Sequence, residues 1–357
     1  MMADLDKQLV AVIMAGGMGT RFWPLSTRQK PKQFITLFGQ RSLLQMSFDR
    51  LRGLVPPERT LVLTNAAHVA LVEEQLPELP AGHVIGEPIR RDTAAAVALA
   101  AVLVQKRFGD SVILTLTADH LIEPRDLFQR NLISAARQVA EKNVFYTFGI
   151  KPAFPATAYG YLETGSRIAD DGGIEHFELK QFKEKPDPET ARQYVESGRF
   201  LWNSGMFVWR AATILGEVRK WLPKHFEALS PLGLHDATPG WQKALEDAFS
   251  AIQPISIDYG VMEKTKTPLR CVASLFSWTD VGGWPAMWDF LSLDARGNAT
   301  RGDVKALDSS GNLVFCEMPD ETVALIGVDD LIVVRSGNRT LVARKDQVDR
   351  LKELGEI

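Results

Sequence analysis

Residues 10–34 read VAVIMAGGMGTRFWPLSTRQKPKQF, in which an apolar strand leads into a glycine loop and then into a segment that carries Arg21 and Lys32. Glycine permits close backbone approach, so successive amides of such a loop can converge on phosphate oxygens. Arg21 can form forked hydrogen bonds with a diphosphate, while Lys32 offers a mobile charge after the rigid Pro31. Glycine turns after strands are common, but these cations at these offsets favour a polyphosphate site. The loop residues expected to contact the phosphates are Ala15, Gly16, Gly17, Gly19 and Thr20.

Two familiar phosphate loops do not fit this stretch. A dinucleotide fingerprint requires G-x-G-x-x-G, and counting from Gly17 and Gly19 places Phe22 where the third glycine belongs. A P-loop would close with Gly-Lys-Ser/Thr, which this loop lacks. The phosphate site is therefore of another kind, and a nicotinamide oxidoreductase is disfavoured.

The run GGMGTRFWPLS followed by PKQF resembles the signature of sugar-nucleotide pyrophosphorylases. The Trp23-Pro24 pair and the PKQF ending look most like mannose-1-phosphate guanylyltransferases, and the resemblance continues in order over residues 8–290. It implies that GTP and mannose 1-phosphate give GDP-mannose and pyrophosphate, by Mg²⁺-dependent in-line attack without a covalent intermediate. Arg21 would then bind the β- and γ-phosphates, and Lys32 would stabilise charge at the α-phosphate.

Composition limits the partners and the compartment. The net charge of −3 gives no electrostatic reason to expect nucleic acid or an anionic membrane. The N-terminus carries two aspartates before a seven-residue apolar run, so we expect no signal peptide, and the apolar stretch at 93–104 is too short to span a bilayer. We expect a cytoplasmic protein. Cys271 and Cys316 suggest neither a disulfide framework nor a metal site, so both should be reduced and structural.

The spacing of apolar runs predicts an α/β fold with a doubly wound, mostly parallel sheet of Rossmann-like type. Strands are expected at 9–15, 60–64, 83–86, 111–117 and 144–150, and helices near 41–52, 66–76, 93–107 and 126–142. Ligands of such sheets lie beyond the carboxyl ends of the strands.

The chain of 357 residues exceeds one comfortable core. We expect a catalytic domain over 1–292 and a small β-rich domain over 293–357, which the resemblance implies is β-helix-like. Its strand edges favour self-association, so we expect a homodimer. The isomerase-type extension of some relatives is not expected.

Two aspartates stand at strand ends far apart in the sequence. Asp119 ends SVILTLTAD, and Asp280 follows an apolar run and precedes a Gly-Gly turn. Each alone could be a turn or cap residue. Together they supply the one or two carboxylates that Mg²⁺ takes beside phosphate oxygens and water. The resemblance implies that this pair holds the metal, and the role of the neighbouring His120 stays open.

The segment GEPIRRDTAAA resembles the nucleobase segment of the family. Glu87 can accept hydrogen bonds from guanine N1–H and N2–H₂, although it could also be a surface glutamate before a proline turn. The same segment supplies Asp92 and Thr93 as nucleotide contacts. Relatives more often carry Asn at the position of Asp92, so the role of this aspartate stays open.

Four later motifs are expected to bind the sugar phosphate. Gly160 in YGY permits a backbone approach to a hydroxyl, and a buried Asn203 must find hydrogen-bond partners. Glu184 and Lys185 would point to opposite faces of a strand unless Pro186 turns the chain. By resemblance, Glu184 accepts from a sugar hydroxyl, Lys185 binds the sugar phosphate, and Asp258 is a secondary candidate.

Two alternatives share this fold. The chain could act on a different hexose 1-phosphate. Epimers differ at one hydroxyl, and the sequence gives little information on which epimer is bound. It could instead be a non-catalytic sensor of sugar nucleotides. The presence of Arg21, Lys32, Asp119 and Asp280 together argues against a sensor.

Overall fold

The computed structural model describes residues 5, 7–17 and 19–354, which form two compact units. The sheet unit comprises the described residues up to Gly16, together with Gln45–Ala118 and Ile122–Trp278. The β-helix unit comprises Gly17–Leu44, Asp119–Leu121 and the described residues from Thr279 onward. The domain boundary expected between residues 292 and 293 stays a prediction.

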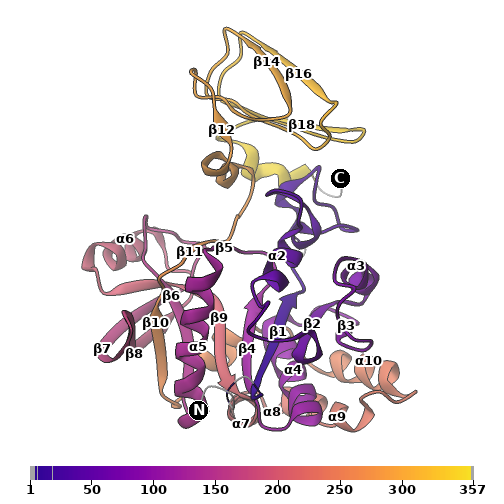
Figure 1. The fold of residues 1–357 in the computed structure, drawn as a ribbon, viewed down its shortest axis with the longest axis vertical. Helices are drawn as coiled ribbons and strands as arrows, with labels where there is room; N and C mark the ends of the chain where they lie inside the picture. Colours follow the sequence, from indigo (N-terminus) through magenta and orange to yellow (C-terminus); the bar gives the residue numbers. More distant parts are fainter. Residues whose placement is uncertain (1–4, 6, 18, 355–357) are drawn as a thin grey trace. The chain divides into compact units, whose positions relative to one another are not determined.

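The sheet unit is built on nine strands in the order β3-β2-β1-β4-β9-β6-β10-β8-β7 (Figure 1). Four of them run parallel at one side: β1 (Leu9–Ala15), β2 (Thr60–Asn65), β3 (Val84–Glu87) and β4 (Val112–Thr117). The others are β6 (Phe145–Ile150), β7 (Tyr161–Asp171), β8 (Ile174–Lys183), β9 (Phe200–Arg210) and β10 (Leu269–Ala273). The five strands expected from the N-terminal half are confirmed.

The long β9 sits between β4 and β6 and runs antiparallel to both. Because β6 and β10 then pair in parallel, β9 joins two parallel groups into one sheet.

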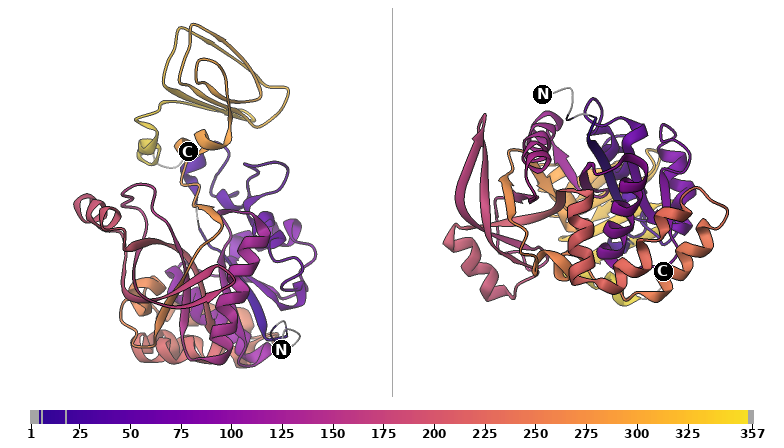
Figure 2. Two further views of the ribbon diagram at one scale, coloured as in Figure 1. Left: turned by 60° about the vertical axis from the view of Figure 1, so that its left-hand side comes forward. Right: turned by 90° about the horizontal axis from the view of Figure 1, so that it is seen from below.

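Helices cover both faces of this sheet (Figure 2). The α5 helix (Arg125–Glu141) packs on one face, against β4, β6, β9 and β10. On the other face α4 (Asp92–Phe108) packs against β1, β2 and β4 and is covered by α7 (Ala211–Trp221) and α8 (Pro223–Leu229). The remaining helices are α2 (Leu43–Asp49), α3 (Val69–Gln75), α6 (Pro188–Ser197), α9 (Leu232–His235) and α10 (Trp241–Ala251).

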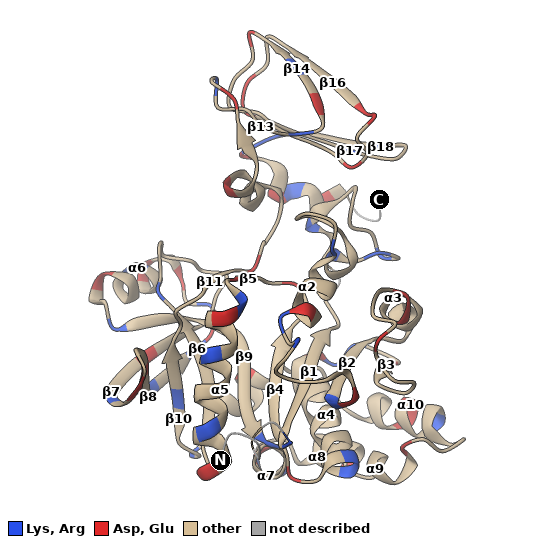
Figure 3. Ribbon diagram, in the orientation of Figure 1, with Lys and Arg blue, Asp and Glu red and all other residues tan. Residues whose placement is uncertain are grey.

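The alanine-rich α4 explains the longest apolar stretch of the chain. Its residues from Ala94 to Val104 are all buried, because small side chains let the helix lie closely between the sheet and α7. Across the described residues, every helix is too short or too polar to cross a membrane. Cys271 and Cys316 are both free and buried, as expected. Figure 3 shows both signs of charge interspersed along the ribbon of each unit.

The C-terminal strands of the β-helix unit form two parallel ladders. One joins β13 (Ala299–Arg301), β15 (Leu313–Cys316) and β17 (Leu331–Ser336), and the other joins β14 (Asp303–Leu307) and β16 (Thr322–Ile326). The chain alternates between the ladders, so it winds as a β-helix. The short β12 (Ser292–Leu293) and the hairpin strand β18 (Arg339–Arg344) are the antiparallel edges. Two short strands precede this region, β5 (Leu121–Glu123) and β11 (Ser277–Thr279).

Buried asparagines connect the turns of the β-helix. Asn298 and Asn312 are fully buried, and the Asn298 Oδ1 accepts from both the main-chain and side-chain nitrogens of Asn312, each at 3.0 Å. The Asn312 Oδ1 in turn accepts from the Leu331 main-chain nitrogen at 2.9 Å. Because buried polar groups must be paired, this ladder fixes the register of successive turns.

Candidate active site

Glu87 is the last residue of β3 and lies at the carboxyl edge of the parallel strands. Its side chain is buried, and its Oε1 has no hydrogen-bond partner among the described residues. A Cβ added to Gly16 would lie 3.6 Å from the Glu87 Oε2. Burial raises the pKa of Glu87 to about 8, while Arg90 lowers it and Asp92 raises it. Glu87 is therefore a buried acid with an unused oxygen beside the first loop glycine.

Asp92 and Thr93 open α4 just beyond this strand. Asp92 has a φ of 62°, a left-handed conformation that Asn and Asp tolerate better than most residues. Its Oδ1 accepts from the Thr93 main-chain nitrogen at 2.7 Å. The Thr93 Oγ1 accepts from the Ile257 main-chain nitrogen at 2.8 Å, so Thr93 positions the segment that carries Asp258.

Asn203, near the start of β9, is buried and is hydrogen-bonded to other expected sugar-binding residues. Its Oδ1 accepts from the Thr147 hydroxyl at 3.0 Å, and its Nδ2 donates to the Asp258 Oδ1 at 3.4 Å. Its main-chain nitrogen donates to the Gly160 carbonyl at 2.8 Å. The partners that a buried asparagine requires are thus supplied by the strand network around it.

Glu184 lies against Gly160, because a Cβ on that glycine would be 2.6 Å from the Glu184 Oε1. Lys185 has a φ of 43°, and its Nζ lies 3.8 Å from the Glu184 Oε2. The two side chains therefore do not alternate across a strand. The chain turns after β8, which is the arrangement that Pro186 permits.

The acids of this cluster are shifted toward their neutral forms. Burial raises the pKa of Glu184 to about 7, and the neighbouring Asp258 raises it further while Lys185 lowers it. Burial likewise raises the pKa of Asp258 to about 6. A carboxyl group that titrates near neutrality can either accept or donate a hydrogen bond. Such a group suits hydroxyls, which do both.

In the β-helix unit, Lys32 is buried and holds two segments together. Its Nζ donates to the Asp119 Oδ2 at 3.0 Å and also to the main-chain carbonyl of Asp280. Burial alone would raise the pKa of Asp119, but Lys32 and His120 outweigh this effect and hold the pKa below its usual value. Asp119 is therefore kept ionised, and its side chain is 36% exposed.

The glycine loop is fitted closely around Lys32. Gly19 has a φ of 47°, and a Cβ there would lie 2.9 Å from the Lys32 main-chain nitrogen and would collide with its Cβ. The Gln33 Nε2 donates to the Gly17 carbonyl at 3.0 Å. Residues of the PKQF run thus contact the glycine loop directly. This contact explains why the glycine loop and the PKQF run occur together in the sequence.

Arg21 approaches Asp280 across a glycine. A Cβ on Gly282 would lie 3.4 Å from the Arg21 Nη1 and 3.2 Å from the Asp280 Oδ1. Glycine at this position leaves the two charged side chains room beside each other. The structure therefore gathers Gly19, Arg21, Lys32, Asp119 and Asp280 in the β-helix unit.

The acidic residues of this group fit a magnesium ion that is shared with a substrate. In the described ranges no three side chains of His, Cys, Asp or Glu gather as a metal cage. Asp119 and Asp280 nevertheless both accept from the Lys32 ammonium, Asp119 through its carboxylate and Asp280 through its main-chain carbonyl. Mg²⁺ is commonly held by one or two carboxylates and completed by phosphates and water, which is what this pair offers.

Two residues that contact the expected sugar-binding residues were not predicted from the sequence. Thr147 is buried in β6 and bonds both Asn203 and the Met206 carbonyl, and a hydroxyl inside the apolar run VFYTFGI was the available signal. The Glu263 Oε1 accepts from the Glu184 main-chain nitrogen at 3.3 Å. No local pattern marked Glu263, because its contact depends on the fold.

The chain is similar to known proteins over nearly its whole length. Residues 10–296 match the Nucleotidyl transferase family, and residues 302–356 match the MannoseP isomerase/GMP-like beta-helix domain. The chain is 38% identical over 352 residues to a mannose-1-phosphate guanylyltransferase from Escherichia coli, covering 98% of this chain and 74% of that protein. It is 40% identical over 356 residues to one from Salmonella montevideo, with 98% and 73% covered.

A solved structure from Thermus thermophilus, described as a mannose-1-phosphate geranyltransferase, has a TM-score of 0.85 and 34% identity over 97% of this chain and 98% of that one. The chain belongs to the nucleotidyl transferase family, and within it to the mannose-1-phosphate guanylyltransferases. It is a nucleotidyltransferase. The fold class and the resemblance inferred from the glycine loop are thereby confirmed.

The close fit of Gly19 against Lys32 gives a test that does not depend on activity. Gly19→Ala should destabilise the protein by about 1–3 kcal/mol more than Gly39→Ala, as judged by urea unfolding. Gly39 is a matched control because its φ is 62° and a Cβ there meets nothing within 4 Å. Both variants carry left-handed strain, and only Gly19→Ala adds the collision. Equal losses would show that the loop is not held against Lys32.

Proposed function

We propose that this protein transfers GMP from GTP to α-D-mannose 1-phosphate, forming GDP-mannose and releasing pyrophosphate. The observation that carries the proposal is the group formed by Lys32, Asp119 and Asp280 behind the glycine loop. A fixed cation and two carboxylates beside a glycine loop are suited to phosphoryl chemistry, in which catalysis is positioning and charge neutralisation. Relatives named for this reaction support the choice of substrates.

The phosphate groups are assigned to the loop and its cations. Main-chain amides of Ala15, Gly16, Gly17, Gly19 and Thr20 would bind the triphosphate. Arg21 would bind its β- and γ-phosphates. Lys32 would stabilise the charge that develops at the α-phosphate. Because its ammonium already pairs with Asp119, it also keeps that carboxylate ionised.

Asp119 and Asp280 are the proposed Mg²⁺ ligands. When bound, the metal would neutralise phosphate charge and orient the α-phosphate for in-line attack. The ionised state of Asp119 favours this role, since a metal ligand must be deprotonated.

Guanine selection is assigned to Glu87, supported by Asp92 and Thr93 at the start of α4. The unused Oε1 of Glu87 is an acceptor without a partner among the described residues, and guanine N1–H and N2–H₂ offer two adjacent donors. A base that lacked those donors would leave the carboxylate unpaired in a buried position, which is strongly unfavourable.

The sugar phosphate is assigned to the cluster around Asn203. Glu184, Asn203 and Asp258 would bind mannose hydroxyls, while the Gly160 backbone gives them room. Lys185 is 61% exposed at its side chain, so it can reach a phosphate in solvent. A sugar-phosphate oxygen would then attack the α-phosphorus while pyrophosphate leaves on the opposite side, with no covalent intermediate.

We also propose that the protein forms a homodimer through the β-helix. Within the described chain, the edge strands β12 and β18 each pair on one side only, and Leu307 and Ile326 are exposed at paired positions of β14 and β16. Exposed edges and apolar pairs of this kind favour association with a second copy.

The reaction is tested by measuring pyrophosphate release over a matrix of four nucleoside triphosphates and several hexose 1-phosphates, with and without Mg²⁺. We expect release with GTP and mannose 1-phosphate, abolished by chelation of Mg²⁺ and reduced by at least about a hundredfold with glucose 1-phosphate or ATP. If another hexose 1-phosphate were preferred, it would take the place of mannose 1-phosphate as the proposed substrate. No release with any pair would overturn the proposed function.

The role of Glu87 predicts a pH dependence of nucleotide binding. Since its pKa is raised to about 8 and only the ionised form accepts both guanine donors, GTP affinity should increase about tenfold between about pH 7 and pH 9. The gain is lost as the pH falls through the raised pKa. Isothermal titration calorimetry at several pH values measures it.

Glu87→Gln is the control for this measurement, because an amide keeps the shape of the side chain but does not titrate in this range. Protonation of GTP itself changes the affinity of both proteins equally, so its effect cancels in the ratio of wild-type to Glu87→Gln affinity. A ratio that does not change with pH would show that Glu87 does not bind the base.

A further inference from the structure

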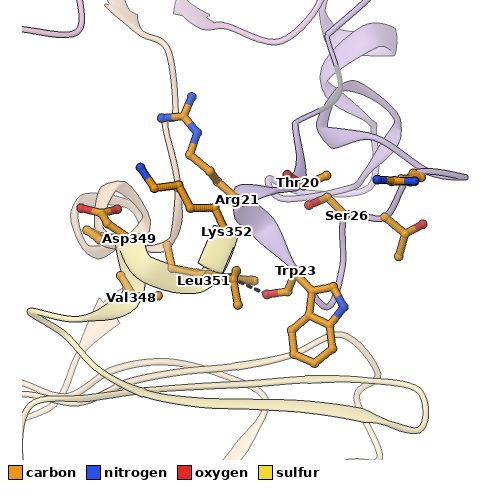
Figure 4. Close-up of a pocket in the computed structure, with 13 residues that line it drawn as sticks. Thr20, Arg21, Trp23, Ser26, Val348, Asp349, Leu351 and Lys352 are labelled. Atoms are coloured by element: carbon orange, nitrogen blue, oxygen red, sulfur yellow. Dashed lines mark hydrogen bonds between the residues drawn. The ribbon is translucent and has the colours of Figure 1, made fainter. Parts of the chain in front are cut away.

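A cavity of about 160 Å³ lies inside the β-helix unit, beside the glycine loop (Figure 4). One wall is the 3-10 helix Thr20–Phe22 with the segment that follows it, and the opposite wall is the C-terminal 3-10 helix Val348–Leu354. The C-terminal helix packs directly on Thr20–Phe22. The last described turn of the chain therefore faces the loop that is proposed to bind the triphosphate.

The walls of this cavity are held by buried aromatic contacts. Trp284 is fully buried, and its Nε1 donates to the Trp23 carbonyl at 2.9 Å. Its ring meets Phe22 and Phe315, each with centroids 5.1 Å apart, so it packs between the loop and the β-helix. The Val348 side chain is buried at the start of the C-terminal helix. The residues that form the walls of the cavity are thus closely packed against the rest of the unit.

The opposite walls of the cavity each contribute a cation, Arg21 and Lys352. Figure 4 shows the side chains of Arg21 and Lys352 reaching toward the same side of the cavity. Within the described part of the chain, no hydrogen bond or ion pair is formed by either side chain. Asp349 also lines the cavity, yet among the described ion pairs it is not joined to Lys352. Both cations line the same cavity, so an anion that enters it would be attracted by the two charges together.

We propose that Lys352 is a phosphate-binding residue of the active site, which binds a diphosphate group together with Arg21. The inference rests on the proposed function and extends it, because it assigns part of the triphosphate site to the C-terminal helix. The ligand is either the β,γ-diphosphate of bound GTP or the free pyrophosphate that leaves. Both present the same charged oxygens, and the two sources are separated in the experiment below.

The chemistry of the two cations favours a diphosphate over a sugar or a base. The guanidinium of Arg21 presents a planar fork that matches two phosphate oxygens, while the ammonium of Lys352 supplies a movable point charge. A hydroxyl or an amide would leave most of this charge uncompensated. Arg28 and Thr20 also line the cavity and add a further charge and a hydroxyl donor.

The test compares Lys352→Gln with Lys352→Arg and with a matched control, Lys305→Gln. Lys305 is an exposed lysine of the same unit that lies outside the cavity and pairs with Asp303 at 2.9 Å. Binding of inorganic pyrophosphate, GTP and GDP to the full chain is measured by isothermal titration calorimetry. Urea unfolding verifies that each variant keeps its fold.

We expect Lys352→Gln to raise the Kd for pyrophosphate and for GTP about tenfold, as the loss of one charge-assisted contact implies. Lys352→Arg should restore most of the affinity, and Lys305→Gln should change it by less than about twofold. An effect on pyrophosphate alone would assign Lys352 to the departing product, and an effect on GTP alone would assign it to the bound substrate. Either result supports the site.

A wild-type Kd for both ligands in Lys352→Gln would overturn the proposal, as would an equal loss of affinity for GDP, which lacks the γ-phosphate. Arg21→Gln combined with Lys352→Gln should lose less affinity than the sum of the two single changes, because both cations hold one ligand. Failure of the proposed reaction can be distinguished from failure of the proposed Lys352 site. The wild type would then release no pyrophosphate from GTP, while the effect of Lys352 on pyrophosphate binding would remain measurable.

Discussion

The arrangement of the proposed phosphate site depends on the hydrogen bonds of the buried Lys32 ammonium. Lys32 joins three segments that are distant in sequence, since it lies in the PKQF run and bonds to Asp119 and to the Asp280 carbonyl. A buried cation is unfavourable unless it is fully paired, so these partners must be present together. Gly19 lies directly on Lys32, and any side chain there would displace it. The loop, the cation and the two aspartates are thus one constrained set.

Asp119 of the β-helix unit and three candidate site acids of the sheet unit have pKa values shifted in opposite directions. Asp119 remains ionised because Lys32 and His120 outweigh its burial, which is the state that a metal ligand needs. Glu87, Glu184 and Asp258 have a raised pKa, because burial dominates over the nearby cations. Raised pKa values of this kind concentrate at functional sites. The pattern separates groups suited to charge neutralisation from groups suited to hydrogen bonding with a base or a sugar.

Much of the fold could be predicted from the sequence because its signals are local. Apolar runs marked the strands, and the residues that follow them marked the ligand edge. The insertion of β9 between β4 and β6 had no such signal, since strand order depends on long-range packing. The β-helix did leave a signal that was overlooked. DARGN at 294–298 and DSSGN at 308–312 repeat an Asp and a Gly-Asn pair, and the two asparagines form the buried ladder. The burial of Glu87 and the contact of Glu263 with Glu184 could not be predicted from the sequence, because both arise from segments that meet only in the fold.

The central claim is that Lys32 organises Asp119 and Asp280 as a metal-binding pair. A crystal structure of the protein with Mn²⁺ and GDP-mannose tests it most directly, because manganese takes the same oxygen ligands and is located by its anomalous scattering. We predict one anomalous peak that is coordinated by carboxylate oxygens of both Asp119 and Asp280 and by a phosphate oxygen. A peak that contacts neither aspartate, with nucleotide bound, would contradict the account.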